Sequence, residues 1–172
     1  MKKIIGTILI SLLCFSIYAG SANDLALMVG SGSFFSPSEG VSFSYGVSVG
    51  LTKRLDMSAV FLSELTPHPF SRNMVMVELS TALIGNRNTG SKVAGVCVNS
   101  LLSVGGFYRF DNKGAGVYLG LTPLSLGSPI TSRRERGLRT NVGYDFVNNK
   151  VIVTFSPLDI EIYLIGTYRD WF

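Results

Sequence analysis

Residues 41–51 read V-S-F-S-Y-G-V-S-V-G-L, in which large apolar side chains alternate with serine and glycine. A period of two over these eleven residues is typical of a β-strand with two unlike faces. The small face carries no charge, which suits the crowded interior of a narrow barrel whose apolar face is turned to lipid. The length also matches the roughly 9–11 residues that cross a bilayer as a tilted strand. A sheet in a soluble sandwich or a lipocalin-like barrel is the alternative that this stretch alone leaves open.

The composition favours the membrane interpretation. Of the 172 residues, 47% are apolar and only 15% are charged, and the mean hydropathy is +0.36. An ordinary soluble domain carries about 25% charged residues. The long unbroken apolar run lies at the N-terminus, so the apolar residues of a membrane protein with this sequence must be dispersed by alternation, as in a barrel. The length predicts one domain.

The N-terminal segment 1–22 has the layout of a secretory signal peptide. Two lysines follow the first methionine, and an apolar stretch leads into a run of small residues. We expect Sec-type export with cleavage after Ala22 or, alternatively, after Ala19, which leaves residues 23–172 as the barrel domain. Cys14 raises a lipoprotein alternative, which we disfavour because a leucine rather than a small residue precedes it.

The mature chain is nearly neutral and almost free of cysteine. Loss of the two signal lysines lowers the formal charge from +4 to +2, so nothing indicates nucleic-acid binding. Cys97 remains as a single cysteine, which excludes an internal disulfide framework and gives no basis for a metal cluster. We therefore predict no metal and no cofactor, and a fold held together by backbone pairing.

The mature sequence consists of alternating segments separated by turn residues, with no helical periodicity. Residues 123–137 contain the longest stretch that we expect to be irregular. The fold class is therefore all-β. The predicted strands cover residues 25–35, 41–51, 55–65, 74–84, 92–110, 115–124, 138–146, 151–155 and 160–172.

The strand number is ambiguous between eight and ten. Residues 92–110 are either one long strand or two strands joined near Asn99 and Ser100, and Pro157 marks either a kink or a turn. Single-chain bacterial barrels have even strand numbers, and eight is the commoner size for a chain of this length. We predict a closed, antiparallel, up-and-down barrel of eight strands. Ten strands would place the expected loop at 123–137 outside the cell, the usual position for a long loop.

The whole chain resembles the small bacterial outer-membrane barrels, the group that includes the transmembrane domain of outer-membrane protein A and the OmpX and OmpW proteins. The resemblance rests on the signal peptide, the alternating strands, the tight turns and a last strand that ends in aromatic residues, Tyr168-Arg169-Asp170-Trp171-Phe172. It implies a monomeric barrel in the outer membrane, surrounded by outer-membrane lipid. It also implies that the barrel-assembly machinery reads the C-terminal phenylalanine.

Seven charged residues fall in the inward-facing register of the predicted strands. An arginine or lysine that faces lipid at mid-depth costs about 2–4 kcal/mol, so a shared inward register supports the barrel independently of the apolar pattern. In a lumen filled by side chains, we expect these charges to neutralise one another and to plug the barrel. A selectivity filter for a polar solute is the alternative. The residues are Glu64, Glu78, Arg109, Arg139, Asp145, Glu161 and Arg169.

Arg133, Arg134 and Arg136 lie within the stretch that we expect to be irregular. Such a triplet usually forms the solvated face of a loop. Because the arginine fork also matches phosphate geometry, the three residues are candidates for binding an anion, either lipopolysaccharide or a ligand on a host surface.

An enzymatic role has one candidate constellation. Some outer-membrane barrels are lipid A acyltransferases or deacylases that use histidine and serine near the membrane surface. Here His68, with Ser63, Glu64 and Ser71, is the candidate base and nucleophile pair. The deacylase spacing His-x-Ser is absent, and prolines flank His68, so a turn role is sufficient. We predict a barrel that is not an enzyme, with a structural, surface-interaction or small-solute conduit role, and keep lipid A modification as the alternative.

Overall fold

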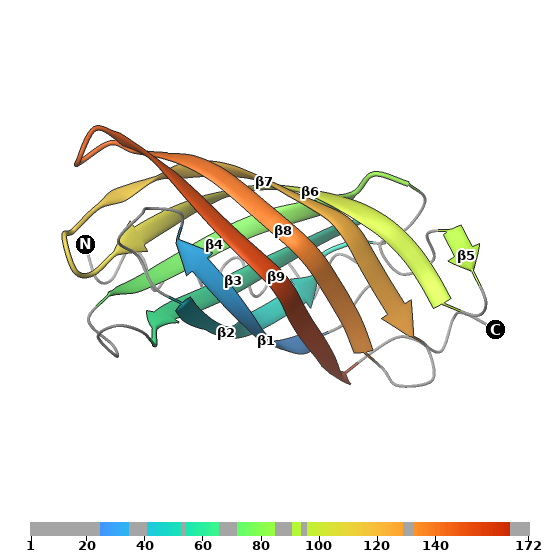
Figure 1. The fold of residues 1–172 in the computed structure, drawn as a ribbon. Helices are drawn as coiled ribbons and strands as arrows, with labels where there is room; N and C mark the ends of the chain where they lie inside the picture. The colour runs from blue at the N-terminus through green and yellow to red at the C-terminus, as the bar shows by residue number, and fades with distance from the viewer. Residues whose placement is uncertain are drawn as a thin grey trace.

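The computed structural model describes residues 25–34, 41–52, 54–65, 72–84, 91–93, 96–128 and 133–165. Its strands form a single sheet that curves into a barrel (Figure 1). They are β1 (Leu25–Phe34), β2 (Val41–Gly50), β3 (Leu55–Glu64), β4 (Asn73–Ala82), β5 (Ser91–Val93), β6 (Val96–Arg109), β7 (Ala115–Ser128), β8 (Arg133–Asp145) and β9 (Lys150–Ile165). Among these residues, no helix is long and apolar enough to cross a membrane.

The barrel closes through the pairing of β4 with β6. The strand order around the wall is β4-β3-β2-β1-β9-β8-β7-β6, every pairing is antiparallel, and Met74 pairs with Arg109 across the closure. The three residues of β5 pair with the start of β6 and take no part in the closure. Eight strands therefore form the wall, which confirms the predicted closed eight-stranded barrel.

Residues 96–109 form one strand, so the alternative of two strands joined near Asn99 and Ser100 is wrong. The pairing of β6 with β7 shifts by one residue between Asn99 and Leu101, as expected of a β-bulge. The Ser100 hydroxyl donates a hydrogen bond to the Pro123 carbonyl oxygen across this irregularity at 2.7 Å. Asn99 and Ser100 thus mark a β-bulge, through which the strand continues in the same direction, and not a turn between two strands.

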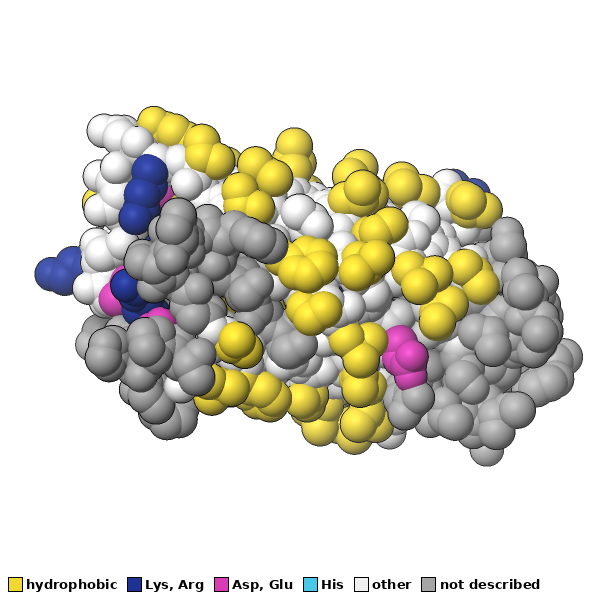
Figure 2. All heavy atoms as spheres, viewed as in Figure 1, with side chains coloured by type: hydrophobic (Ala, Val, Ile, Leu, Met, Phe, Trp, Pro, Cys, Tyr) yellow, Lys and Arg dark blue, Asp and Glu magenta, His cyan; other side chains and the backbone are white. Residues whose placement is uncertain are grey.

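The small face of β2 lies inside the barrel, as the alternation predicts. Ser44 and Ser48 are buried, while Tyr45 between them is 46% exposed on the outer wall. A Cβ atom on Gly46 would stand 2.1 Å from the carbonyl oxygen of Ala59, so the lumen admits only glycine there. Figure 2 shows hydrophobic side chains spread over the outer wall and charged side chains mainly toward its ends.

Residues 123–137 are mostly strand, contrary to the expectation of an irregular stretch. Strand β7 continues to Ser128 and β8 begins at Arg133. Pro123 and Pro157 both lie opposite Leu138, whose φ of 57° interrupts the ladder, and the pairings on both sides skip this row. Neither proline is therefore required to donate a hydrogen bond to the sheet, which is why the strands tolerate both.

This interrupted row changes which residues face the lumen. On β8 the inward side chains include Arg134 and Arg136 before Leu138, at even positions, and Arg139 and Asn141 after it, at odd positions. On β9 the inward face likewise shifts by one residue, which brings Asp159 inside. A β-bulge re-aims side chains in this way.

The two ends of the barrel differ in their connections. Leu25 pairs with Ile165, so the first and last described strands begin and end at one edge, the terminal end. The opposite edge, which we call the hairpin end, carries the short turns at 110–114 and 146–149. The predicted signal segment 1–22 and the aromatic C-terminal residues 168–172 lie outside the described residues.

Candidate functional site

The lumen contains a cluster of buried arginines and carboxylates, which we call the lumen network. Its first member is Arg134 on β8, a side chain with no exposure to solvent. The Arg134 Nη2 atom lies 2.7 Å from Asp56 Oδ2 on β3, and its Nε atom lies 2.5 Å from Glu161 Oε2 on β9. Arg134 thus connects β8 to a strand on the other side of the lumen.

Arg136 makes the largest number of ion pairs in the lumen network. Its Nη2 atom lies 3.3 Å from Asp56 Oδ1 and 2.5 Å from Glu161 Oε1, and its Nη1 atom lies 3.2 Å from Glu78 Oε1 on β4. Because all four side chains are almost completely buried, these charges interact in a medium that screens them little.

Arg139 extends the lumen network toward the hairpin end. Its Nη2 atom lies 3.5 Å from Glu78 Oε2 and its Nη1 atom lies 3.3 Å from Asp159 Oδ2. The row that contains Leu138 separates Arg139 from Arg136, and it is the reason that side chains three residues apart share the lumen.

Hydroxyl groups supply further donors to the carboxylates. Glu78 accepts hydrogen bonds from the Tyr118 hydroxyl on β7 and from the Ser58 hydroxyl, each at 3.0 Å. Asp159 accepts one from the Ser156 hydroxyl at 2.9 Å. A buried charge is tolerated when it is both paired and hydrogen-bonded, and these carboxylates meet both conditions.

The lumen network ties opposite walls of the barrel together. Strands β3 and β4 supply two of its carboxylates, and β8 and β9 supply the other two and all three arginines. Three strands separate β3 from β8 around the wall, so the ion pairs cross the lumen. Its four carboxylates and three guanidinium groups carry a formal charge of −1. The members are Asp56, Glu78, Arg134, Arg136, Arg139, Asp159 and Glu161.

Little space remains beside the lumen network. One cavity of about 10 Å³ lies between Met76, Tyr118 and Thr154, and a second of about 10 Å³ lies between Leu62, Arg139 and Ser156. Each has room for about one water molecule. Beside the lumen network, these two cavities therefore leave room only for single water molecules.

Three of the predicted lumen charges, Glu78, Arg139 and Glu161, belong to the lumen network. Arg109 is also buried, but its Nη2 atom lies 2.8 Å from Asp111 Oδ2 in the turn at the hairpin end. That position separates it from the ion pairs at the centre of the barrel.

The other predicted lumen charges have different surroundings. Glu64 is buried at the end of β3, with Oε2 3.8 Å from Arg72 Nε. The Asp145 Oδ1 atom accepts hydrogen bonds from the backbone N–H groups of Val147 and Asn148, both at 3.0 Å, and so closes the β8–β9 turn. Arg169 lies outside the described residues.

The prediction that Arg134 and Arg136 form a solvated, anion-binding loop is wrong. Both residues are on β8 and fully buried, and carboxylates of the lumen network occupy their guanidinium groups. Arg133 is the first residue of the same strand. The prediction failed because it treated residues 123–137 as irregular and began the next strand at residue 138, whereas β7 continues through Pro123 and β8 begins at Arg133.

Sequence reasoning also missed Asp56 and Asp159 as lumen charges. Asp56 lies two residues before Ser58 in the predicted strand 55–65, and so on the same inward face. The alternation could therefore have identified Asp56 as a lumen charge. Asp159 follows Pro157 closely, and its inward direction depends on the shift at the interrupted row, which the alternation by itself does not reveal.

The candidate catalytic constellation is only partly described. The Ser63 hydroxyl donates a hydrogen bond to Asn73 Oδ1 at 2.8 Å, and Glu64 lies beside Arg72. His68 and Ser71 lie outside the described residues. Lipid A modification therefore stays an untested hypothesis.

A comparison with solved structures identifies a barrel of the same architecture. The crystal structure of the N-terminal β-barrel domain of Pseudomonas aeruginosa OprF matches with a TM-score of 0.58, covering 83% of this chain and 98% of that one. This chain has the fold of the OprF barrel domain. The two sequences are 9% identical, so the similarity concerns the fold. The predicted resemblance to small outer-membrane barrels is confirmed at that level. No protein-family model and no curated protein matches the sequence.

The hydroxyl of Tyr118 gives a direct test of the lumen network. We expect Tyr118→Phe to lower the free energy of unfolding by about 1–2 kcal/mol, because it removes a donor to a buried carboxylate that keeps its other partners. Urea unfolding of the refolded protein in lipid vesicles measures this change. Tyr144→Phe is the matched control, since that hydroxyl is exposed and lies 3.4 Å from Asn149 Oδ1; we expect a change within about 0.5 kcal/mol. Equal losses from both variants would contradict a special role for Tyr118.

Proposed function

We propose that this protein is a monomeric bacterial outer-membrane barrel with a structural role, and that its plugged lumen makes it unsuited to act as a general porin. The lumen network is the observation that carries this proposal. An open pore needs a continuous column of water, whereas three arginines and four carboxylates cross this lumen and the adjoining cavities hold about one water molecule each.

The outer wall supports a location in lipid. Large apolar side chains on seven of the eight strands of the wall are substantially exposed, and such an extensive apolar surface is rare in soluble monomers. A closed barrel leaves no unpaired strand edge, which satisfies the main requirement for crossing a bilayer with β-structure. Examples from six strands are Leu27, Val47, Val77, Val104, Leu119 and Leu164.

Aromatic rings mark one boundary of this surface. Tyr45 lies against Phe61 with ring centroids 5.2 Å apart, Phe61 lies 6.1 Å from Phe110, and Phe110 lies 5.2 Å from Tyr108. The four residues come from β2, β3, β6 and the adjoining turn, all toward the hairpin end. Transmembrane barrels carry such girdles at the interface between lipid and water. The hairpin end is accordingly the part of the barrel that emerges from the bilayer beyond these rings.

Export and assembly follow from the same proposal. The segment 1–22 would direct the chain through the Sec pathway, and the C-terminal Phe172 would be read by the barrel-assembly machinery. In the membrane, a plugged barrel has its two ends available for contacts with lipopolysaccharide, with other envelope components or with a host surface.

The test combines location with conductance. We expect the full-length protein to fractionate with the outer membrane and to migrate faster unheated than boiled on a detergent gel, because a closed ladder of backbone bonds resists detergent. In planar bilayers we expect no large, steady current from the purified protein, with a general porin from the same membranes as the positive control. A soluble protein without a heat shift would contradict the membrane location. Large porin-like currents would contradict the plugged lumen.

A further inference from the structure

The outer wall has a groove at the hairpin end, where β4, β6 and β7 meet. Its volume is about 460 Å³. Gly106 and Ala115 form part of its floor, and the larger side chains Val77, Tyr108 and Phe146 stand around it. The groove is thus an apolar hollow in a surface that is elsewhere covered by large side chains.

The pairing register explains why the wall is hollow here. Gly106 stands in one row with Val77 on one side and Val117 on the other, while Tyr108 in the next row pairs with Ala115. Gly106 and Ala115, the two smallest outward-facing residues that line the groove, are therefore diagonal neighbours. A Cβ atom on Gly106 would meet nothing closer than a backbone oxygen at 3.5 Å, so the space above this glycine is open.

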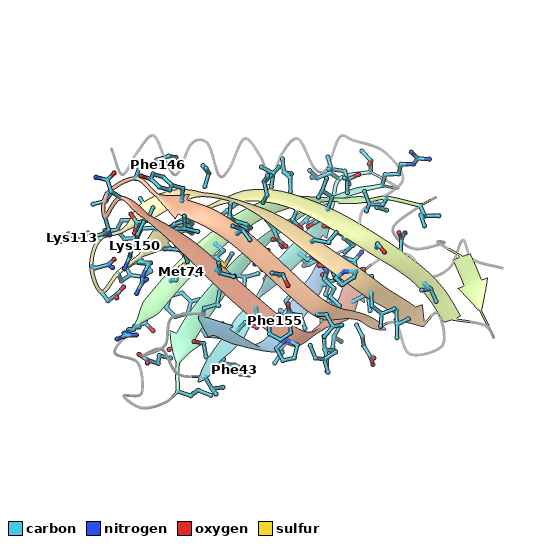
Figure 3. The ribbon with its side chains drawn as sticks, turned by 45° about the horizontal axis from the view of Figure 1, so that its top comes forward. Phe43, Met74, Lys113, Phe146, Lys150 and Phe155 are labelled. Atoms are coloured by element: carbon cyan, nitrogen blue, oxygen red, sulfur yellow. The ribbon has the colours of Figure 1, made fainter. Side chains whose placement is uncertain are left out.

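A lysine lies in the turn that adjoins the end of the groove. Lys113 is in the β6–β7 turn, two residues before Ala115. Figure 3 shows Phe146 and Lys113 at the same end of the barrel. Lys113 is exposed, and the acidic residue of that turn, Asp111, is bound by Arg109. The turn at the end of the apolar groove therefore carries a net positive charge.

We propose that this groove binds one acyl chain of an anionic phospholipid, whose phosphate contacts Lys113. The inference rests on the proposed membrane location, because the bilayer is the source of the lipid. An apolar hollow that ends beside an exposed ammonium group matches a lipid, in which an acyl chain is joined to a negatively charged headgroup. Lysines near a membrane surface favour anionic lipid in the same way.

The first experiment fills the groove. Native mass spectrometry of the full-length protein in detergent, titrated with phosphatidylglycerol, counts the lipid molecules retained. Gly106→Leu places a side chain in the hollow and is expected to weaken retention of one lipid by about tenfold. Gly137→Leu is the matched control, because Gly137 also faces outward and a Cβ atom there meets nothing closer than 3.6 Å, but it lies outside the groove. We expect this control to retain lipid like the parent.

The second experiment removes the charge. Lys113→Asn is expected to weaken retention of phosphatidylglycerol by roughly fivefold, and to leave zwitterionic phosphatidylcholine less affected. Asparagine suits position 113 because its φ of 56° lies in the left-handed region. Arg54→Gln, an exposed cation in the β2–β3 turn at the opposite end, is the control and is expected to have no effect.

Several results would overturn the inference. Equal lipid retention by Gly106→Leu and Gly137→Leu would show that the groove holds no lipid. An unchanged preference for phosphatidylglycerol in Lys113→Asn would remove the assigned headgroup contact. A dimer that Gly106→Leu abolishes would assign the groove to a second copy of the chain. The heat shift of each variant is recorded in parallel. If the parent protein shows the heat shift but retains no lipid, only the lipid-binding inference is wrong. If the parent protein shows no heat shift, the proposed membrane barrel is wrong.

Discussion

Replacing Arg136 with leucine is expected to lower the free energy of unfolding by about 3–5 kcal/mol, the usual cost of breaking a buried ion pair by removing one partner. The guanidinium of Arg136 contacts Asp56, Glu78 and Glu161, so its loss leaves three buried carboxylates with fewer partners. Urea unfolding of the refolded barrel in lipid vesicles measures the change. A variant that does not refold at all, and so shows no heat shift, agrees with the same expectation.

Arg72→Leu is the matched control for this prediction. The Arg72 side chain is 33% exposed and its Nε atom lies 3.8 Å from Glu64, so we expect a loss of no more than about 1 kcal/mol. Arg136→Lys retains the positive charge but loses the planar guanidinium group that contacts several carboxylates at once. We expect its loss of unfolding free energy to lie between those of Arg136→Leu and Arg72→Leu. If Arg136→Leu were as stable as Arg72→Leu, the lumen would be wet enough to solvate its carboxylates and the plugged lumen would be wrong.

Replacing Gly105 with valine is expected to destabilise the barrel by about 3 kcal/mol, the upper part of the usual range for overpacking. Gly105 faces the lumen, where a Cβ atom would stand 2.4 Å from the carbonyl oxygen of Val77 and 2.6 Å from the hydroxyl of Tyr118. The backbone oxygen has little freedom to move. Displacement of Tyr118 would also remove its hydrogen bond to Glu78.

The neighbouring residue provides the control, because Gly106→Val makes the same chemical change on the opposite face of the same strand. Its Cβ atom has ordinary van der Waals space at 3.5 Å, and valine has a higher strand propensity than glycine. We expect Gly106→Val to be neutral or stabilising by less than about 1 kcal/mol. Equal destabilisation by Gly105→Val and Gly106→Val in urea unfolding would contradict the assignment of one face of β6 to the lumen and the other to the lipid.

The lumen network also has a consequence for strand register. A shift of one residue would move the inward side chains of a strand to the outer wall. For β8 this would turn Arg134, Arg136 and Arg139 toward the lipid, at a cost of about 2–4 kcal/mol for each arginine near the middle of the bilayer. Buried charges contribute little net stability, but here they penalise every incorrect register. We infer that the arginines specify which pairing the strands adopt.

Much of the fold was predictable from the sequence because its determinants are local. The alternation at 41–51 reports directly which side chains of β2 face the lumen, since the two faces of a strand repeat with a period of two. The same reasoning placed Glu78, Arg139 and Glu161 inside the barrel. It also gave the strand number, because the length and the requirement for an even count leave few alternatives.

The centre of the candidate site depended on the tertiary structure. Pro123 and Pro157 each indicate a break when read alone, because proline has no N–H group to donate to a sheet. Only in the folded barrel do both lie beside Leu138, in a row where no ladder hydrogen bond is needed, so that β7, β8 and β9 continue past it. The shift at that row turns Arg134, Arg136 and Asp159 inward. Their partners Asp56 and Glu78 are far away in the sequence, and closure of the barrel brings them across the lumen.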